Sequence, residues 1–366
     1  MQLEANLPLN SEEQLLQTAI TYFQDIIAPQ ANLLDQSPQA LKKALQGMGE
    51  RGLLALRVPQ EWGGAGVSEL TYRHFQMLIS RYSGALSFLQ MQHQSAGSQL
   101  VASEHEALKQ EYLPRMGSGE VLLGIGFSHL RRAGEPVMKA TPVEGGYILS
   151  GIVPWVTGLG FFDDCIMAAT LPDGQALYGV IPLREMDQPG GGQIRFSEAM
   201  ELIVVGSTNT VRSELKQWFL AADRVVCIQP ANAIQENDAK NVLHHGFFAL
   251  GCAQAALDIV ERVYYQKQLP FIAEAFNRLS DELETCRHKM LIATAIEGAF
   301  DDEGLPLRAW AINLAGRCAR AAVAVSSGAA NGLDHPAGRV YREALLFTVA
   351  GQTTAVMEAT LEQLLC

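Results

Sequence analysis

The sequence predicts an α+β protein in which a β-rich region lies between two helical regions. Residues 1–117 and residues 229–366 carry apolar side chains at helical spacing. Residues 118–228 instead contain short apolar runs that glycine, proline and aspartate separate at close intervals. This order differs from the strand–helix alternation of a Rossmann domain. We therefore expect three domains with these bounds: an N-terminal helical domain, a middle β domain and a C-terminal helical bundle.

The N-terminal region is predicted to form several helices joined by short loops. Residues 11–14, SEEQ, have the spacing of a capping box, and a periodic apolar stripe follows them. Residues 37–38, Ser-Pro, predict the cap and the first turn of a second helix. The stretch PQEWGGAG, residues 59–66, is typical of a loop. Apolar periodicity then returns over residues 70–101 and 104–115.

The middle region is predicted to be an antiparallel β-sandwich or barrel. Its apolar runs are VLLGIGF, VMKATPV, GYILSGI, CIMAAT, ALYGVIPL and VRSELKQWFL. Their length and the turn residues between them favour strands over helices. After residue 228 the helical period returns, and four or five long helices are expected. Residues 305–332 are rich in alanine and nearly apolar, which predicts a helix that is buried on most sides.

The composition excludes several classes of protein. The net charge is −12, and no dense run of lysine and arginine indicates a nucleic-acid partner. No apolar run is long enough to cross a membrane, and no signal sequence precedes the first helix. The six cysteines form no metal-binding pattern, so we expect reduced thiols, no bound metal and a cytoplasmic location. They are Cys165, Cys227, Cys252, Cys286, Cys318 and Cys366.

One stretch of the middle region, GYILSGIVPWVTGLG, places a tryptophan and a hydroxyl two residues apart in a strand pattern. Alternate residues of a strand point to the same face, so Trp155 and Thr157 would face one object together. The alternative is that Trp155 fills the β core and that Thr157 is an ordinary strand residue.

Five segments, taken in order, resemble the acyl-CoA dehydrogenase family. They are VPQEWGGAG, YLPRMGSGEVLLGIGFS, GYILSGIVPWVTG, ALGCAQAALD and HPAGRVYREA. The resemblance covers nearly the whole chain. It implies an all-α N-terminal domain, a middle β domain and a C-terminal four-helix bundle that together hold FAD. It also implies a role in fatty acid metabolism and a homo-oligomer, either a homodimer or the tetramer usual in the family.

The resemblance implies a set of flavin-binding residues. Trp155 would pack on the isoalloxazine ring, and Thr157 would lie at its reactive nitrogen, N5. Ser128 would donate a hydrogen bond to a flavin carbonyl. Further residues at family cofactor positions are Phe127, Val156, Lys267 and Thr353.

The sequence departs from the family where the catalytic base is expected. Most members remove the substrate's α-proton with a glutamate, whose position in this chain is Gly351. A minority, including the isovaleryl type, carry the base on an earlier helix, where this chain has Asn241. The arginine that helps to bind CoA becomes Val242. Residues 128–135 correspond to the family's flavin loop, but its Glu-Pro is absent and Arg131 and Arg132 appear instead. These two arginines either hold a phosphate or carboxylate beside the flavin or lie on a solvated loop.

Three titratable residues remain as candidate catalytic groups. Asp238 lies one helical turn before Asn241 and is either a relocated base or an exposed acid at a helix start. His93 and His129 are either catalytic residues or core residues whose ring nitrogens have hydrogen-bond partners. A histidine pair, residues 244–245, begins the helix that flanks the substrate in the family, and either ring could point inward.

Three functions are compatible with these residues. The first is a flavin-dependent oxidoreductase that acts on the CH–CH group of an acyl thioester and transfers a hydride to flavin N5. The second is a flavin-dependent monooxygenase of the same fold, which needs no carboxylate base and takes another apolar substrate. The third is a catalytically inactive relative that lacks the base. The first two functions imply an electron-transfer or flavin-reductase partner.

Overall fold

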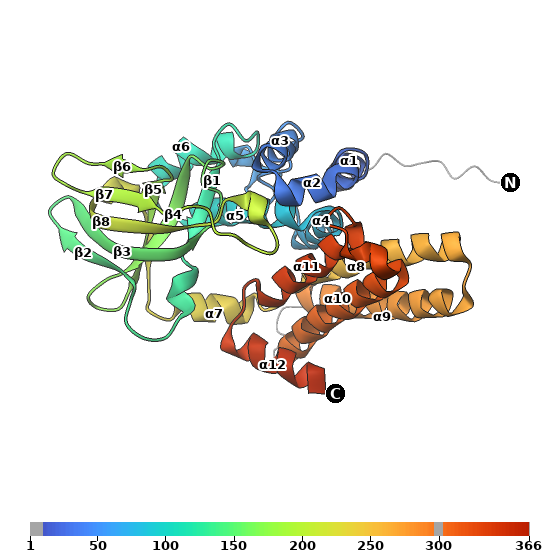
Figure 1. Ribbon diagram of the computed structural model, residues 1–366. Helices are drawn as coiled ribbons and strands as arrows, with labels where there is room; N and C mark the ends of the chain where they lie inside the picture. Colours follow the sequence, from blue (N-terminus) through green and yellow to red (C-terminus); the bar gives the residue numbers. More distant parts are fainter. Residues whose placement is uncertain (1–9, 296–302, 366) are drawn as a thin grey trace.

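The computed structural model describes residues 10–295 and 303–365, and it has the α+β architecture that the sequence predicts. In Figure 1 the strands lie on the left, the first four helices at the upper right and the last five at the lower right. Helix α7, Ala233–Lys240, lies between the sheet and the C-terminal helices. The three regions therefore surround a common centre.

The N-terminal region forms six α-helices within the described residues. They are α1 Ser11–Tyr22, α2 Ala31–Gln36, α3 Pro38–Gly49, α4 Glu69–Tyr82, α5 Gly84–Ala102 and α6 Glu106–Met116. The predicted capping box of α1 is displaced by one residue, because the extended Asn10, and not Ser11, accepts the backbone hydrogen bond of Glu13. Ser37 caps α3 as predicted, by accepting from Ala40 N. The long periodic segment after residue 70 is two helices, which Ser83 separates.

The middle region forms one sheet of nine strands within the described residues. Its strands are β1 Leu123–Gly126, β2 Met138–Val143, β3 Gly146–Val156, β4 Asp164–Thr170, β5 Ala176–Pro182, β6 Met186–Asp187, β7 Gln193–Phe196, β8 Val211–Ala221 and β9 Val225–Gln229. The order is β6-β7-β8-β3-β2-β4-β5-β9, and β1 pairs with β4. Most pairs are antiparallel as predicted, but β1–β4 and β2–β4 are parallel. Short apolar runs cannot reveal strand direction, which depends on how distant segments meet.

The C-terminal region forms long helices that pack on one another and on α4. After α7 they are α8 Gly246–Lys267, α9 Pro270–Ala295, α10 Gly304–Ser326, α11 Pro336–Val349 and α12 Thr354–Leu365. The alanine-rich α10 packs against α8, α9, α11 and α12, as its apolar sequence predicts. Small side chains on α10 allow this close approach of several helices.

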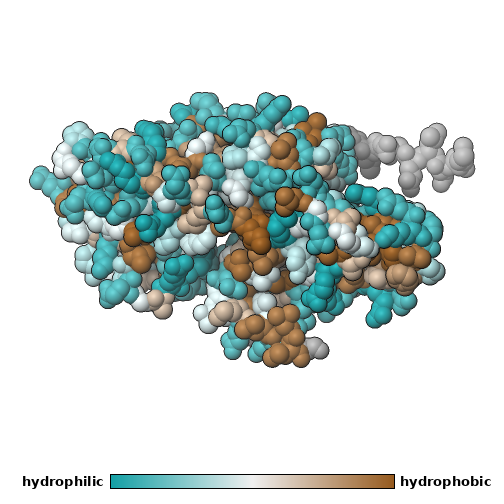
Figure 2. Space-filling model, in the orientation of Figure 1, coloured by the Kyte–Doolittle hydropathy of each residue, from teal (hydrophilic) through white to brown (hydrophobic). Residues whose placement is uncertain are grey.

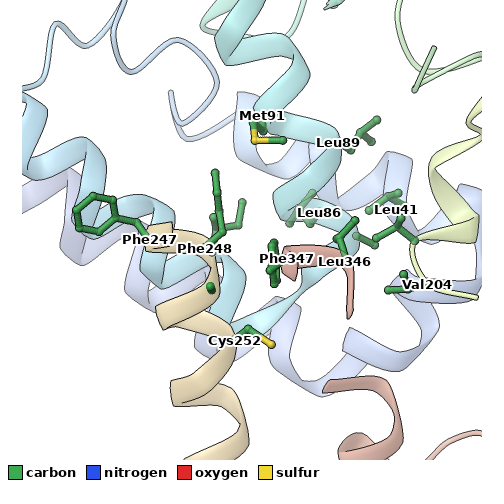
Figure 3. Packing of buried hydrophobic residues seen from close by; sticks show 14 of the residues in the cluster. Leu41, Leu86, Leu89, Met91, Val204, Phe247, Phe248, Cys252, Leu346 and Phe347 are labelled. Carbon is green, nitrogen blue, oxygen red and sulfur yellow. The ribbon is translucent and has the colours of Figure 1, made fainter. Parts of the chain in front are cut away.

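The core where α5, α8 and α11 meet connects the N-terminal and C-terminal helices. Phe248 of α8 and Phe347 of α11 stack with their ring centres 6.1 Å apart and their planes 7° apart. Leu86 and Met91 of α5 and Val204 of the β7–β8 loop lie around them (Figure 3). Packing between all three regions therefore fixes the position of α11 and of the turn that follows it.

A buried ion pair adds a polar contact to this core. Arg339 and Glu343 of α11 are almost fully buried. The Nη1 atom of Arg339 lies 2.7 Å from each carboxylate oxygen of Glu343. Glu343 also accepts a hydrogen bond from Gly84 N at 2.8 Å. A Cβ at Gly84 would lie 2.7 Å from Glu343 Cγ, so the N-terminus of α5 can approach α11 only with glycine there.

Within residues 10–295 and 303–365, no helix has the length and apolar character needed to cross a membrane. No cluster of three or more potential metal ligands occurs in the same residues. Cys165, Cys252, Cys286 and Cys318 are buried free thiols, and Cys227 is half-buried. Cys366 lies outside the described residues.

Replacing Glu343 by alanine is expected to lower the free energy of unfolding by about 3–5 kcal/mol, because the buried Arg339 guanidinium loses its carboxylate. Chemical denaturation followed by circular dichroism measures this change. The control is Glu358→Ala on the exposed side of α12, for which a change within about 0.5 kcal/mol is expected. Equal stabilities for the two variants would contradict the assigned role of the ion pair.

Candidate functional site

A cavity of about 1080 Å³ lies between the sheet and the helices. Its wall combines α5, the residues after β1, the end of β3, the β7–β8 loop, α7, the start of α8, α10 and the turn after α11. Figure 2 shows a hollow at the centre of the molecule, with hydrophobic residues along its rim. This volume is slightly above the usual range of about 300–1,000 Å³ for pockets that bind small molecules and cofactors.

The sheet side of the cavity contains Trp155, Thr157, Phe127 and Ser128. Strand alternation places Trp155 and Thr157 on the cavity wall and turns Val156 into the core, where it is fully buried. The Trp155 side chain is 44% exposed, so a large aromatic surface is open to the cavity. Thr157 is buried, and its Oγ1 lies 3.0 Å from Thr210 Oγ1. The structure thus brings together the two segments that carry the predicted flavin residues.

The cavity is lined by four arginines and one carboxylate among the described residues, although the whole chain is acidic. These residues are Arg57, Arg131, Arg132, Arg308 and Asp238. Asp238 forms a two-pronged ion pair with Arg131, at 2.6 Å from Oδ2 to Nε and 2.8 Å from Oδ1 to Nη2. Both oxygens of the predicted relocated base therefore already accept hydrogen bonds from a cation.

The two positions predicted for the family's base, Asn241 and Gly351, lie on turns beside the cavity. Asn241 ends α7, and its side-chain amide donates to Asn237 O and Oδ1 at 3.0 Å. Gly351 follows α11 in the left-handed backbone conformation, with φ of +59°. A Cβ at Gly351 would collide with the imidazole ring of His245. The space that a side chain from position 351 would enter is thus taken by the side chain of His245, the N-cap residue of α8.

His244 and His245 both line the cavity but have different partners. The His244 ring nitrogens lie 2.7 Å from Arg73 Nη1 and 2.9 Å from Gln76 Nε2, so α4 holds this ring. His245 packs beside His244 and Phe248, and its ring forms none of the hydrogen bonds found in the described residues. Burial lowers the pKa of both imidazoles well below 6.5, and nearby arginines lower it further.

Arg308 of α10 closes the base of the cavity and is 1% exposed. Its Nη1 donates to Val242 O at 3.0 Å, and its Nη2 donates to Ala350 O at 2.7 Å. It forms no ion pair within the described residues, and burial lowers its pKa to about 10. Arg308 therefore joins the turn before His245 to the turn that contains Gly351.

The other predicted catalytic histidines do not line the cavity. His93 is fully buried, with Nε2 3.1 Å from Met116 O and Nδ1 3.0 Å from Leu123 N. His129 is buried, and its Nε2 lies 3.1 Å from Ala168 O. Burial lowers the pKa of each ring to about 4, so both are neutral at pH 7. Their contacts are to backbone that positions β1 and β4.

Two further predicted cofactor residues, Lys267 and Thr353, lie apart from the sheet side of the cavity. Lys267 is near the far end of α8, where its Nζ donates to Val325 O at 2.7 Å. Thr353 lines the cavity on the helical side and accepts a hydrogen bond from Val356 N, in the first turn of α12. Sequence reasoning did not single out Arg308 or Arg57. The signal that the sequence offers for Arg308 is a charged residue in an otherwise apolar helical segment.

Replacing Gly351 by alanine is expected to destabilise the protein. The left-handed backbone costs about 1–2 kcal/mol with a side chain, and the new Cβ meets His245. Combining Gly351→Ala with His245→Ala removes the collision, so we expect the double variant to be more stable than the sum of the two single changes by about 1 kcal/mol. Denaturation curves of the three variants measure this coupling.

The matched control is Gly316→Ala on α10, where no atom lies within 4 Å of the new Cβ. This change is expected to stabilise the protein by about 0.5–1 kcal/mol, because alanine favours a helix. Additive effects of Gly351→Ala and His245→Ala would contradict the packing described between them.

Comparison with known proteins identifies the fold of the chain and the family model that its N-terminal region matches. The structure superposes on butyryl-CoA dehydrogenase from Megasphaera elsdenii with a TM-score of 0.82 and 17% identity over 100% of both chains. An acyl-CoA dehydrogenase from Bacillus anthracis, solved in complex with FAD, gives a TM-score of 0.80 at 17% identity, over 98% of this chain and 67% of the other. The fold is therefore that of the acyl-CoA dehydrogenases.

Sequence comparisons agree with this fold. Residues 10–120 match the family model described as "Acyl-CoA dehydrogenase, N-terminal domain". A probable acyl-CoA dehydrogenase of Bacillus subtilis is 23% identical over 96% of this chain and 97% of its own length. Mitochondrial isovaleryl-CoA dehydrogenase of Pongo abelii is 32% identical over 40% of this chain, and the match spans 36% of that relative. Residues 10–120 thus match the N-terminal domain model of the acyl-CoA dehydrogenases, and the rest of the chain shares their fold.

Proposed function

We propose that the protein is a flavin-dependent oxidoreductase that oxidises the CH–CH group of an acyl-CoA thioester. The observation that carries the proposal is the composition of one cavity wall. Residues from two separate segments, 127–128 and 155–157, stand at family flavin positions and line the same cavity. Helices α5 and α7 and the two histidines that precede α8 line the cavity as well and provide the substrate side.

The residues present fit FAD. Trp155 offers an open aromatic surface of the kind that a planar ring system covers. Ser128 and Thr157 supply hydroxyl groups that can donate to polar ring atoms. The similar acyl-CoA dehydrogenase from Bacillus anthracis was solved with FAD. When bound, FAD would supply a two-electron acceptor, and the side chains named here would hold and orient its ring.

The opposite wall fits an acyl chain with both apolar and polar contacts. The β7–β8 loop contributes Leu202 and Ile203 to the cavity. Helix α5 contributes Gln92, Ser95 and Gln99, which lie three to four residues apart and so share one face. The relatives named for isovaleryl-CoA and butyryl-CoA support a short acyl thioester as substrate.

A flavin-dependent monooxygenase of the same fold is a second candidate. It is favoured by the absence of a carboxylate at positions 241 and 351 and by the presence of His244 and His245 on the wall. An inactive relative would have its flavin pocket filled by apolar side chains, whereas the cavity in this protein measures about 1080 Å³. The proposal further includes a homodimer or homotetramer, an electron-transfer or flavin-reductase partner and a cytoplasmic location.

The purified protein is expected to bind FAD and to show the visible absorption of an oxidised flavin. Trp155→Ala should weaken FAD binding about tenfold or more, because losing an aromatic contact of about 1.4 kcal/mol corresponds to that factor. Fluorescence titration with FAD measures the dissociation constant. The control is Tyr265→Ala, which removes an exposed ring on α8 that does not line the cavity.

Anaerobic addition of butyryl-CoA or isovaleryl-CoA is expected to bleach the flavin absorption. Bleaching by one thioester would support dehydrogenase chemistry. A bound flavin that no thioester bleaches would favour the monooxygenase, and failure to bind FAD after reconstitution would contradict both functions.

A further inference from the structure

We propose that His245 replaces the family's catalytic carboxylate and accepts the α-proton of the acyl thioester. This inference rests on the proposed function, because it assumes a thioester in the cavity. It goes beyond that function by naming the residue that accepts the proton. This residue is at neither of the two positions, 241 and 351, where the family's base is expected. Three independent features of the structure support it.

The first feature is the place of the ring. Gly351 is the position of the family's usual glutamate, and its missing side chain would collide with the imidazole of His245. His245 is half-buried as a residue and is part of the cavity lining. The imidazole thus occupies the space into which a glutamate side chain at position 351 would project.

The second feature is the availability of its nitrogen atoms. His244 is held by Arg73 and Gln76, whereas His93 and His129 contact backbone groups away from the cavity. The His245 ring forms no hydrogen bond with any described residue. A group that accepts a proton must be within reach of it and must have a free lone pair. Among the histidines of the cavity wall, His245 meets this condition.

The third feature is the charge around the ring. The charged groups near His245 are Arg308 of α10, Arg131 of the turn after β1 and Arg73 of α4, and the His244 ring lies beside it. Asp238 of α7 pairs with Arg131, and Glu69 of α4 pairs with Arg73, so Arg308 is the one of the three arginines without a carboxylate partner among the described residues. The positive charge of Arg308 keeps the imidazole neutral and favours a developing negative charge on the substrate.

The proton transfer changes no oxidation state, so it needs no oxidant. The bond between Cα and its hydrogen breaks, and the proton goes to a ring nitrogen of His245. The electron pair stays on the substrate as an enolate, with its charge on the thioester oxygen. The enolate then lies beside the new imidazolium, and this opposite charge favours the protonated ring.

The test follows exchange of the α-hydrogens with D₂O. The probe is 3,3-dimethylbutyryl-CoA, which has α-hydrogens but no β-hydrogen and so cannot be oxidised. Mass spectrometry of the recovered thioester gives the exchange rate. We expect the wild-type protein to catalyse exchange and His245→Gln to lower the rate about 100-fold or more, the usual contribution of a general base. Tyr265→Ala, which removes an exposed ring on α8 outside the cavity, should leave the exchange rate unchanged.

Two further measurements separate catalysis from folding. In the double variant His245→Ala with Gly351→Glu, a carboxylate enters the space that the ring leaves, and exchange should recover at least partly. In the wild-type protein the NMR signals of the His245 ring nitrogens should shift when 3,3-dimethylbutyryl-CoA is added. Because the pKa of His245 lies well below 6.5, the exchange rate should be constant from about pH 6 to pH 8.

The outcomes distinguish this inference from the proposed function. Unchanged exchange in His245→Gln, with loss in Asp238→Asn, would assign the proton to Asp238 and overturn the inference. Flavin bleaching by butyryl-CoA that persists in His245→Gln would also overturn it while leaving the function intact. A wild-type protein that neither exchanges the probe nor is bleached by any thioester would overturn both.

Discussion

The buried guanidinium of Arg308 is the interaction on which the helical side of the cavity depends. It donates to Val242 O and to Ala350 O and so joins the turn before α8 to the turn after α11. No carboxylate pairs with it in the described part of the chain, so its burial is costly. The carbonyl end of α11 offsets part of this cost, because Ala350 is its C-cap and helix C-termini attract cations. The joined turns place His245 against Gly351.

The sheet side depends on a simpler constraint, the alternation of side chains along β3. Val156 points into the core, so Trp155 and Thr157 must face the other way. The core at Phe248 and Phe347 then holds the helices at a fixed distance from this wall. An aromatic surface on the sheet side and arginines on both the sheet side and the helical side line the cavity. Both sides suit a planar cofactor and a substrate that develops negative charge.

The sequence predicts the helices and strands of this protein better than it predicts how distant segments meet around the cavity. Periodicity predicts the helices and most strands, because each pattern reflects local geometry, and spacing alone predicts that Trp155 and Thr157 share a face. The parallel pairing of β1 with β4 lies beyond such patterns. The contact between His245 and Gly351, which are about a hundred residues apart, also lies beyond such patterns, because Arg308 and the packing of α8 on α11 bring the two residues together. The sequence shows that a carboxylate is missing, but only the fold shows which side chain takes its space.

A crystal structure of the protein with FAD and 3,3-dimethylbutyryl-CoA tests the central claim most directly. The account predicts that the flavin ring covers Trp155 and that the thioester Cα lies about 3–3.5 Å from a ring nitrogen of His245, the separation of reacting groups. A thioester Cα beside Asp238, or an acyl group outside the cavity, would contradict the account.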